Sequence, residues 1–458
     1  MGRQAGFDFE LTITAQGERY AVNVRSPVGR AGGDFVPPFS KSEVEDFLLR
    51  LDRSRGMRSA RASGVELAKD FGGRLYDALF HGQLLTQFRR SVDRAQREGA
   101  QLRVRLQLQD APHLAQLPWE YLYNRAENDF LALSTLTPIT RYIRREPISP
   151  LRVVPPLRIL AVVSAPRDYP PLDAAAERDK LERALRESIR GDLLAGNRMA
   201  VEWLTWQEGE PMLVALQRIL RRGDYHVFHF IGHGRFEAQG EQGALILEDA
   251  DGYGVAISGE RLGNYLRDEI RVARTLRLAV LNACQSGLSS SKGLAGGVAT
   301  ALVQMGIPAV IAMQAEISDE GAIAFAQGFY AALADGWPVD LALTEGRKGI
   351  YAISDLEWGK PVLYTYAADG RIFDVGPRPT REEVDREFQI ASLYAEGRAA
   401  MSAQSWRQAL KKFEAVLALD PDHRDAAMYL DVVRSHVSNL SEPNPYDQYT
   451  GNKRTCQD

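Results

Sequence analysis

Two short segments of the chain carry a histidine and a cysteine that could act together as base and nucleophile. The first segment runs from residue 225 to 234 and contains His233; the second runs from 278 to 287 and contains Cys284. A thiol becomes a strong nucleophile when it loses its proton, and a neighbouring imidazole is the usual base. This pair of residue types therefore predicts nucleophilic attack by a thiolate.

The elements that must position these two residues are strands of a parallel sheet. Both segments contain an apolar run, at 225–231 and 276–283, of the kind that forms a buried parallel strand. In open α/β sheets, ligands bind beyond the carboxyl ends of the strands. We therefore expect His233 and Cys284 just past the ends of their strands, on the face where an active site belongs.

The glycines beside His233 favour a catalytic interpretation over a purely structural one. Gly232 and Gly234 allow the backbone to bend sharply and to approach a ligand closely. The N–H groups of Gly234 and Cys284 could donate to a developing oxyanion, each such donor being worth about 3–4 kcal/mol. The alternative is that Cys284 is a buried structural cysteine, as many cysteines are.

Three neighbouring histidines raise the question of a metal site. His226 and His229 point to opposite faces of a strand, because side chains alternate with a period of two. We expect no metal there, and we interpret His229 as a sheet residue that orients His233. The glycines at 293–297 open a helix but lack the lysine and hydroxyl of a phosphate-binding loop. The sequence therefore predicts no cofactor.

Composition limits the class of protein. A length of 458 residues predicts two or three domains, and a net charge of −4 gives no bulk electrostatic reason to expect nucleic acid. The two cysteines, Cys284 and Cys456, argue against a disulfide framework and suit a reducing cytoplasm. No signal-peptide core or membrane-spanning run is found. We expect a cytoplasmic protein that binds neither nucleic acid nor membrane.

The pattern of elements predicts an α/β fold in three parts with a tail. Residues 1–150 form a compact α/β unit without cysteine, and prolines at 147, 150, 155 and 156 mark its end. Residues 151–376 alternate strands with helices, which predicts a mainly parallel sheet covered by helices on both faces. Residues 381–437 are helical, and 438–458 have the composition of a disordered tail.

Individual elements follow from the same patterns. Strands are predicted at 102–108, 130–142, 157–165, 199–204, 225–231, 276–283, 309–313 and 361–365, with hairpins at 7–25 and 244–258. Helices are predicted from residue 42, and at 64–98, 172–193, 211–220, 259–268, 294–304, 319–335 and 338–352. A Gly/Pro-rich loop is expected between residue 25 and residue 40.

The helical segment at 381–437 has the spacing of a tetratricopeptide pair. The small, aromatic and proline positions of such a repeat are matched by Gly397, Ala409, Phe413 and Pro421. Leu393 and Ala400 stand where a tryptophan and a tyrosine are expected, and helix 423–437 would cap the pair. A single repeat does not form a stable solenoid alone. We therefore expect it to dock on the rest of the chain or on a protein partner.

Taken together, His229-Phe-Ile-Gly-His233-Gly234 and Leu281-Asn-Ala-Cys284-Gln-Ser-Gly287 resemble the CHAT family, caspase-like peptidases often fused to tetratricopeptide repeats. A histidine about 50 residues upstream of the cysteine is also the arrangement of caspases. Further similar segments lie at 117–120 (Leu-Pro-Trp-Glu), 306–314, 317–319 with Phe325 and Tyr330, 338–342 and 358–364. The resemblance spans about residues 100–366.

The resemblance implies a fold and a set of roles. It implies a caspase-like sheet, a cysteine endopeptidase with His233 as base and Cys284 as nucleophile, and a degenerate caspase-like companion domain in residues 1–150. In arginine-specific metacaspase relatives an acidic residue lies shortly before the nucleophile. The corresponding position in this chain is the neutral Asn282. Glu316 stands in a place similar to the aspartate of separase that binds the residue before the cleaved bond (P1). Asp319, nearby, is expected to cap the following helix.

Two functions remain open on these grounds. The first is an active endopeptidase that cleaves protein substrates, with a preference for a basic P1 residue bound by Asn282, Glu316 and Asp319. A partner or ligand would regulate it through the repeat in a bacterial defence or signalling system, with 288–293 as an ordering or cleavage loop. The second is a catalytically silent scaffold that recruits protein partners through the repeat. The intact His233/Cys284 pair favours the first.

Overall fold

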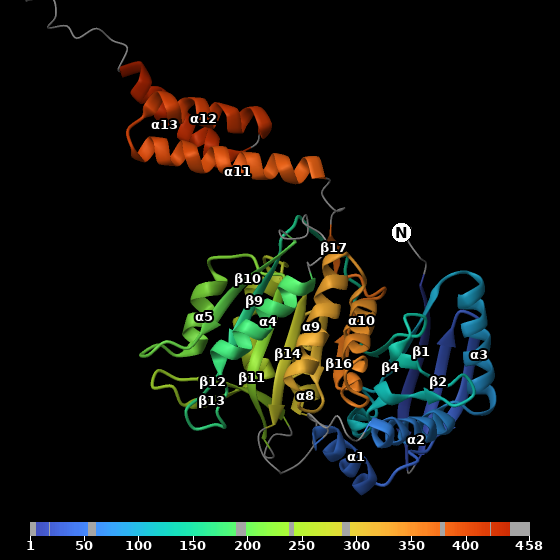
Figure 1. Ribbon diagram of the computed structural model, residues 1–458. Helices are drawn as coiled ribbons and strands as arrows, with labels where there is room; N and C mark the ends of the chain where they lie inside the picture. Colours follow the sequence, from blue (N-terminus) through green and yellow to red (C-terminus); the bar gives the residue numbers. More distant parts are fainter. Residues whose placement is uncertain are drawn as a thin grey trace, which may run out of the picture. The chain divides into compact units, whose positions relative to one another are not determined.

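The computed structural model describes residues 6–17, 19–53, 61–188, 198–237, 242–285, 294–375, 381–421 and 423–439. The chain divides into two compact units, residues 1–376 and 377–458. The larger unit is built on one mixed sheet with helices on both faces (Figure 1). The predicted α/β class is therefore confirmed.

Within the described residues the large sheet has 13 strands, in the order β10-β9-β11-β14-β15-β16-β7-β4-β1-β2-β3, with β12 and β13 added beside β11. These strands are β1 (Gly6–Gln16), β2 (Arg19–Ser26), β3 (Gly29–Phe35), β4 (Gln101–Gln107), β7 (Ile139–Tyr142), β9 (Leu157–Val163), β10 (Met199–Thr205), β11 (Val227–Glu237), β12 (Gln242–Glu248), β13 (Gly254–Ser258), β14 (Leu278–Gln285), β15 (Ala309–Met313) and β16 (Pro361–Thr365). Two small sheets pair β5 (Tyr123–Asn124) with β6 (Asp129–Phe130), and β8 (Leu151–Val153) with β17 (Phe373–Val375).

The sheet consists of two parallel blocks that meet at an antiparallel pair. Strands β10, β9, β11, β14 and β15 run parallel to one another, as do β16, β7, β4 and β1. The blocks join where β15 pairs antiparallel with β16. Because β7 and β4 precede residue 150, one sheet runs through both of the predicted α/β domains, and their boundary at 150 stays a prediction.

Helices cover both faces of the block formed by β10, β9, β11, β14 and β15. Alternate residues of each strand therefore pack into two different hydrophobic cores, one on each face. The helices of the larger unit are α1 (Lys41–Arg53), α2 (Arg61–Leu79), α3 (Gly82–Arg97), α4 (Ala174–Ser188), α5 (Met212–Leu220), α6 (Gly259–Tyr265), α7 (Arg267–Arg271), α8 (Leu294–Met305), α9 (Asp319–Ala334) and α10 (Val339–Tyr351). One core packs Val280 and Ile311 against α4, α9 and α10 (Figure 1). The other packs Ala279 and Val310 against α5, α6 and α8. This alternation follows from the two-residue period of a strand.

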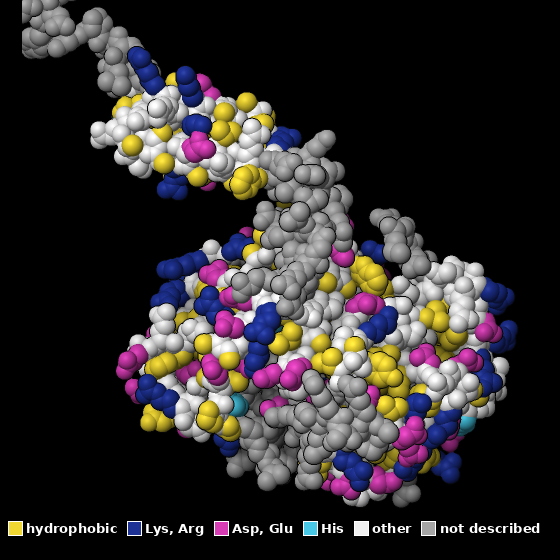
Figure 2. All heavy atoms as spheres, in the orientation of Figure 1, with side chains coloured by type: hydrophobic (Ala, Val, Ile, Leu, Met, Phe, Trp, Pro, Cys, Tyr) yellow, Lys and Arg dark blue, Asp and Glu magenta, His cyan; other side chains and the backbone are white. Residues whose placement is uncertain are grey.

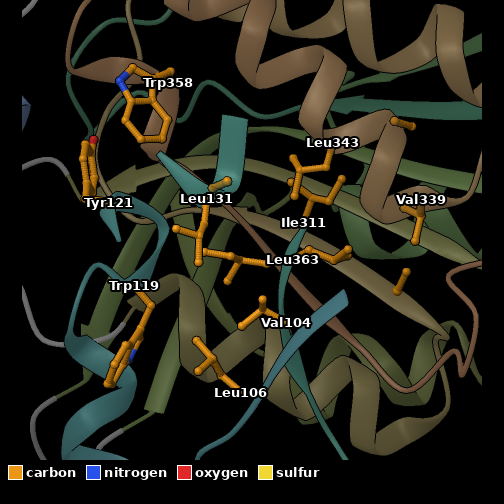
Figure 3. Close-up of a cluster of buried hydrophobic side chains, with 14 of the residues drawn as sticks. Val104, Leu106, Trp119, Tyr121, Leu131, Ile311, Val339, Leu343, Trp358 and Leu363 are labelled. Carbon is orange, nitrogen blue, oxygen red and sulfur yellow. The ribbon is translucent and has the colours of Figure 1, made fainter. Parts of the chain in front are cut away.

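The core under α9 and α10 continues into the N-terminal part of the chain. Figure 3 shows Val104 and Leu106 of β4 beside Leu363 of β16 and Ile311 of β15. Trp119 is fully buried in the same cluster. The two blocks of the sheet therefore share one hydrophobic core, and neither would be fully covered without the other.

Several predicted elements differ from the observed ones for identifiable reasons. Strand β3 replaces part of the expected loop: its three glycines hide the alternation that reveals a strand. The single helix expected at 64–98 is two helices, because the chain turns at Gly82 with φ +50°. The strand expected at 130–142 is interrupted by a 3₁₀ turn at 131–133, and only its last part is β7.

The described residues of the smaller unit form an assembly of three helices. Helices α11 (Arg381–Ser402), α12 (Trp406–Leu419) and α13 (Arg424–Asn439) enclose a core that includes Ala409 and Phe413. A Cβ on Gly397 would lie 2.9 Å from the Phe413 ring, so α11 and α12 approach each other closely there. Residues 438–439 of the predicted tail end α13, and the rest of that tail lies outside the described residues. The tetratricopeptide assignment stays a prediction.

Two surface properties bear on the environment of the protein. Lys, Arg, Asp and Glu side chains intermix over the face shown in Figure 2, and neither sign dominates it. Among helices in the described ranges, none is both long and apolar enough to cross a membrane.

A buried ion pair between the two blocks should contribute strongly to the stability of their junction. Arg103 Nε of β4 lies 2.6 Å from Asp340 Oδ2 at the start of α10, and both side chains are almost fully buried. Asp340→Ala leaves a buried guanidinium unpaired and should lower the free energy of unfolding by about 3–5 kcal/mol. Glu345→Ala, which removes a partly exposed pair with Lys348 on the same helix, should cost at most about 0.5 kcal/mol. Urea denaturation measures both; equal losses would contradict this assignment.

Candidate active site

The candidate nucleophile and base face each other across two adjacent parallel strands. Strand β11 pairs with β14, and the register makes His233 and Cys284 direct partners at Cα. The next pair along, Gly234 and Gln285, closes the parallel ladder. This register places both residues at the same edge of the sheet.

The prediction that both residues lie just past their strands is wrong in detail. His233 lies inside β11, and Cys284 lies inside β14. The neighbouring strands stop earlier: β9 pairs with β11 only as far as Ile231, and β15 with β14 only as far as Leu281. Strand β11 continues because β12 pairs with it antiparallel from Gly234 onward. The candidate pair therefore sits on a ladder that extends beyond the parallel strands beside it.

The imidazole of His233 is held by a loop that sequence reasoning missed. Its Nε2 atom lies 3.0 Å from the carbonyl oxygen of Pro170. A carbonyl oxygen only accepts hydrogen bonds, so Nε2 carries the proton and Nδ1 is the basic nitrogen. The ring of Tyr169 stacks on the imidazole, with 5.4 Å between centroids. The only sequence signal for this loop was its position after the strand predicted at 157–165.

The electrostatic environment keeps His233 neutral. Partial burial lowers the pKa of His233 below its usual value of 6.5, and the hydrogen bond to Pro170 opposes part of that change. At neutral pH the residue is therefore uncharged, with Nδ1 able to accept a proton. That is the protonation state that a general base requires.

The glycine before His233 is required by a close approach. A Cβ on Gly232 would lie 2.9 Å from the carbonyl oxygen of Ser164 and 2.8 Å from the ring of Phe230. Gly234 is buried and lies between two strands, opposite Gln285 of β14 and Leu245 of β12. The role of Gly234 as an oxyanion donor stays a prediction.

The other two histidines have separate partners. His229 Nδ1 lies 2.6 Å from the hydroxyl of Tyr330, deep under α9, and burial lowers the pKa of His229 to about 4. His226 Nδ1 accepts from the backbone N–H of Arg158 at 2.8 Å. The interpretation that His229 orients His233 is therefore wrong, since Pro170 does so. Within the described ranges, no three His, Cys, Asp or Glu side chains gather closely enough to hold a metal ion.

A small pocket opens next to the candidate pair. Its volume is about 30 Å³. Ile231 and Asn282, which face each other two residues before His233 and Cys284, both line it. The other walls are mainly apolar and come from α4, α9 and the central strands, and include Leu181, Val280, Met313 and Phe325.

The three predicted substrate-binding residues occupy different places. Asn282 lines the pocket, together with Lys180. Asp319 lies 2.8 Å from Lys180 Nζ, but it does not cap α9 as predicted: the Ser318 hydroxyl does so by accepting from the N–H of Gly321 at 3.1 Å. Glu316 is half-buried between β15 and α9, and its backbone carbonyl accepts from Lys360; it does not line the pocket.

Three of the remaining motifs meet in a buried polar network between the two sheet blocks. Glu120 binds Arg141 of β7 through both carboxylate oxygens, at 3.2 and 3.0 Å. The same guanidinium reaches the hydroxyl of Tyr364 at 3.3 Å, and Gln314 donates to the carbonyl of Gly359 at 2.7 Å. Segments 117–120, 306–314 and 358–364 thus have one shared structural role. Arg141 was missed, because nothing in its sequence context marks a buried arginine.

Comparison with known families identifies the larger unit. The CHAT domain matches residues 69–364, which is more than half of the chain. The chain belongs to the CHAT-domain family. The matched segment starts in α2, ends in β16 and includes both His233 and Cys284, whereas β1–β3 and the three-helix unit lie outside it. No curated protein matches the chain.

The buried histidine of the CHAT domain should make its stability depend on pH. His229 has a pKa of about 4 in the fold and about 6.5 when unfolded, so between these values only the unfolded state binds the proton, and stability falls as pH falls. His229→Gln keeps an oxygen that can accept from Tyr330. It should reduce the loss of unfolding free energy between pH 7.5 and 4.5 by about 2–3 kcal/mol.

Chemical denaturation at the two pH values measures this loss. His113→Gln, at an exposed position, is the matched control and should retain the wild-type dependence on pH. An unchanged pH dependence in His229→Gln would contradict the neutral, buried state of His229.

Proposed function

We propose that this chain is a caspase-like cysteine endopeptidase in which His233 is the base and Cys284 the nucleophile. The observation that carries the proposal is the register of β11 and β14, which makes these two residues direct partners. Two further observations support it: His233 is held as the Nε2–H tautomer by Pro170, and the CHAT family is consistent with caspase-like peptidases.

The proposed reaction needs no group beyond the chain and water. The Cys284 thiol gives its proton to Nδ1 of His233, and the thiolate attacks the carbonyl carbon of the scissile peptide. The oxyanion that forms takes hydrogen bonds from the N–H groups of Gly234 and Cys284. When the C–N bond breaks, the leaving amine takes the proton from His233 and a thioester remains. His233 then deprotonates a water, which attacks the thioester and releases the acid product and the free thiol.

Substitution of either member of the pair should abolish activity. Cys284→Ala and His233→Ala should each remove peptide cleavage, with nearly equal losses because the two residues act as a unit. A peptidyl electrophile that labels thiols should react with the wild type and not with Cys284→Ala. Cys456→Ser removes the other cysteine and should change neither result.

The same experiment tests the alternative. Folded variants can be recognised by unchanged circular dichroism, and retained turnover in either of them would exclude the assigned roles. A wild type that neither cleaves peptides nor takes the label would favour a silent scaffold that recruits partners through its helical unit.

We propose that Asn282, Glu316 and Asp319 contribute to substrate binding, with a preference for a basic P1 residue. Asn282 supports this because it lines the pocket beside the pair. Asp319 borders the same place through its ion pair with Lys180, which also lines the pocket. The preference for a basic residue rests on Glu316, whose position resembles that of the P1-binding aspartate of separase. The apolar walls of the pocket favour the competing outcome, an apolar P1 residue.

Glu316→Gln tests this preference. A carboxylate pairs with an arginine guanidinium through two hydrogen bonds, so the substitution should lower kcat/KM for Arg-P1 peptides about tenfold, or ~1.4 kcal/mol. Peptides with a neutral P1 residue should be barely affected. Glu320→Gln, at an exposed position in the first turn of α9, is the control. A peptide-library profile with an apolar or acidic P1 residue would overturn the basic preference.

We further propose that the three-helix unit is the tetratricopeptide-like site through which a protein partner regulates the peptidase, in a cytoplasmic defence or signalling system. Its core residues Ala409 and Phe413 occupy the small and aromatic positions of such a repeat. Segment 288–293, the proposed ordering or cleavage loop, lies outside the described residues.

A further inference from the structure

The loop that holds His233 depends on the neighbouring β-hairpin. We define the His233 loop as residues 164–173, between β9 and α4. It supplies the Pro170 carbonyl that accepts from His233 and the Tyr169 ring that stacks on it. Pro170 is exposed, and Tyr169 is only partly buried. Packing of the loop into the core therefore cannot by itself fix these two groups.

Glu248 fixes the beginning of the His233 loop. This last residue of β12 is 5% exposed. One carboxylate oxygen accepts from the N–H of Ala165 at 2.7 Å, and the other lies 2.7 Å from the hydroxyl of Ser164. Burial raises the pKa of Glu248, while the hydrogen bonds from Ser164 and Ala165 lower it. An amide at this position would keep an oxygen that can accept from Ala165.

The turn of the hairpin fixes the middle of the His233 loop. Asp168 Oδ1 accepts from the N–H of Gly254 at 2.7 Å, and the N–H of Arg167 donates to the carbonyl of Gly252 at 2.9 Å. A Cβ on Gly254 would lie 2.5 Å from the ring of Tyr169, so the ring lies directly on the hairpin backbone. These contacts set the position of the residue that precedes Pro170.

Strand β12 thus contacts both of the elements that position the imidazole of His233. At its start, β12 pairs with β11 beyond His233, where Leu245 faces Gly234. At its end, Glu248 binds the His233 loop. The hairpin therefore contacts both the strand that carries His233 and the loop that carries its hydrogen-bond acceptor, and it can set the distance between them.

We propose that Glu248 and Asp168 are positioning residues for His233, which fix the Pro170 carbonyl and the Tyr169 ring against the imidazole. The proposal rests on the proposed function, because it assumes that His233 activates Cys284. Neither carboxylate touches the reacting atoms in this role. Both act through the loop, and misplacement of a base by even a small distance slows proton transfer strongly.

The test measures thiol reactivity, which requires no knowledge of the substrate. In a Cys456→Ser background, iodoacetamide alkylates Cys284, and the rate from pH 5 to 9 reports how His233 activates the thiol. Asp168→Ala and Glu248→Ala should each slow alkylation at pH 6.5 at least about fivefold, towards the rate of His233→Ala. The rates should converge at pH 9, where the thiol ionises without help.

Conservative variants and a matched control separate positioning from damage to the fold. Asp168→Asn and Glu248→Gln keep an acceptor oxygen and should stay within about twofold of the wild type. Asp251→Ala removes an exposed carboxylate from the same turn and should change nothing. If Glu248→Ala fails to fold, Asp168→Ala decides the matter, because Asp168 is exposed.

The outcomes distinguish an error in the proposed function from an error in the positioning role of Asp168 and Glu248. If His233→Ala does not slow alkylation, the pair itself, and with it the proposed function, is wrong. If His233→Ala slows the reaction while Asp168→Ala and Glu248→Ala do not, only the positioning role is overturned. A loss in Asp251→Ala as large as that in Asp168→Ala would also overturn it.

Discussion

The parallel ladder between β11 and β14 is the constraint on which the candidate site depends. A shift of one residue in its register would place Ala283 or Gln285 opposite His233 and turn every following side chain to the other face. The register is fixed by packing, since alternate residues of both strands fill two different cores, such as Val280 on one side and Ala279 on the other. The hydrophobic pattern that builds the sheet therefore also sets the pairing of His233 with Cys284.

The N-terminal part of the chain belongs to this structure rather than standing beside it. Strands β4 and β7 extend the same sheet, and Arg141 of β7 carries the hydrogen bonds that gather Glu120 and Tyr364. Each of these hydrogen bonds offsets part of the cost of burying the guanidinium. Residues before and after position 150 therefore meet in defined hydrogen bonds. The CHAT match accordingly includes residues before position 150, from residue 69 onward.

The sequence predicts the elements that are determined by a pattern of side chains, and it misses the features that depend on the backbone. The apolar runs at 309–313 and 361–365 coincide with β15 and β16, because a buried strand needs an uninterrupted apolar segment. The pairing of His233 with Cys284 follows from similar runs. Strand β3 and the extension of β11 were missed, since glycines and an added partner strand leave no periodic pattern. Pro170 was missed because it acts through its carbonyl, which any residue could supply.

An imidazole oriented by a backbone carbonyl differs physically from one oriented by a carboxylate. A carbonyl fixes the tautomer of the neutral imidazole and does not itself titrate, but it brings no negative charge to stabilise an imidazolium. That is consistent with a pKa of His233 below its usual value. A backbone acceptor also cannot be placed by its own side chain, so the loop that carries Pro170 must be fixed from outside. The hydrogen bonds that Ala165 and Gly254 donate to Glu248 and Asp168 meet that requirement.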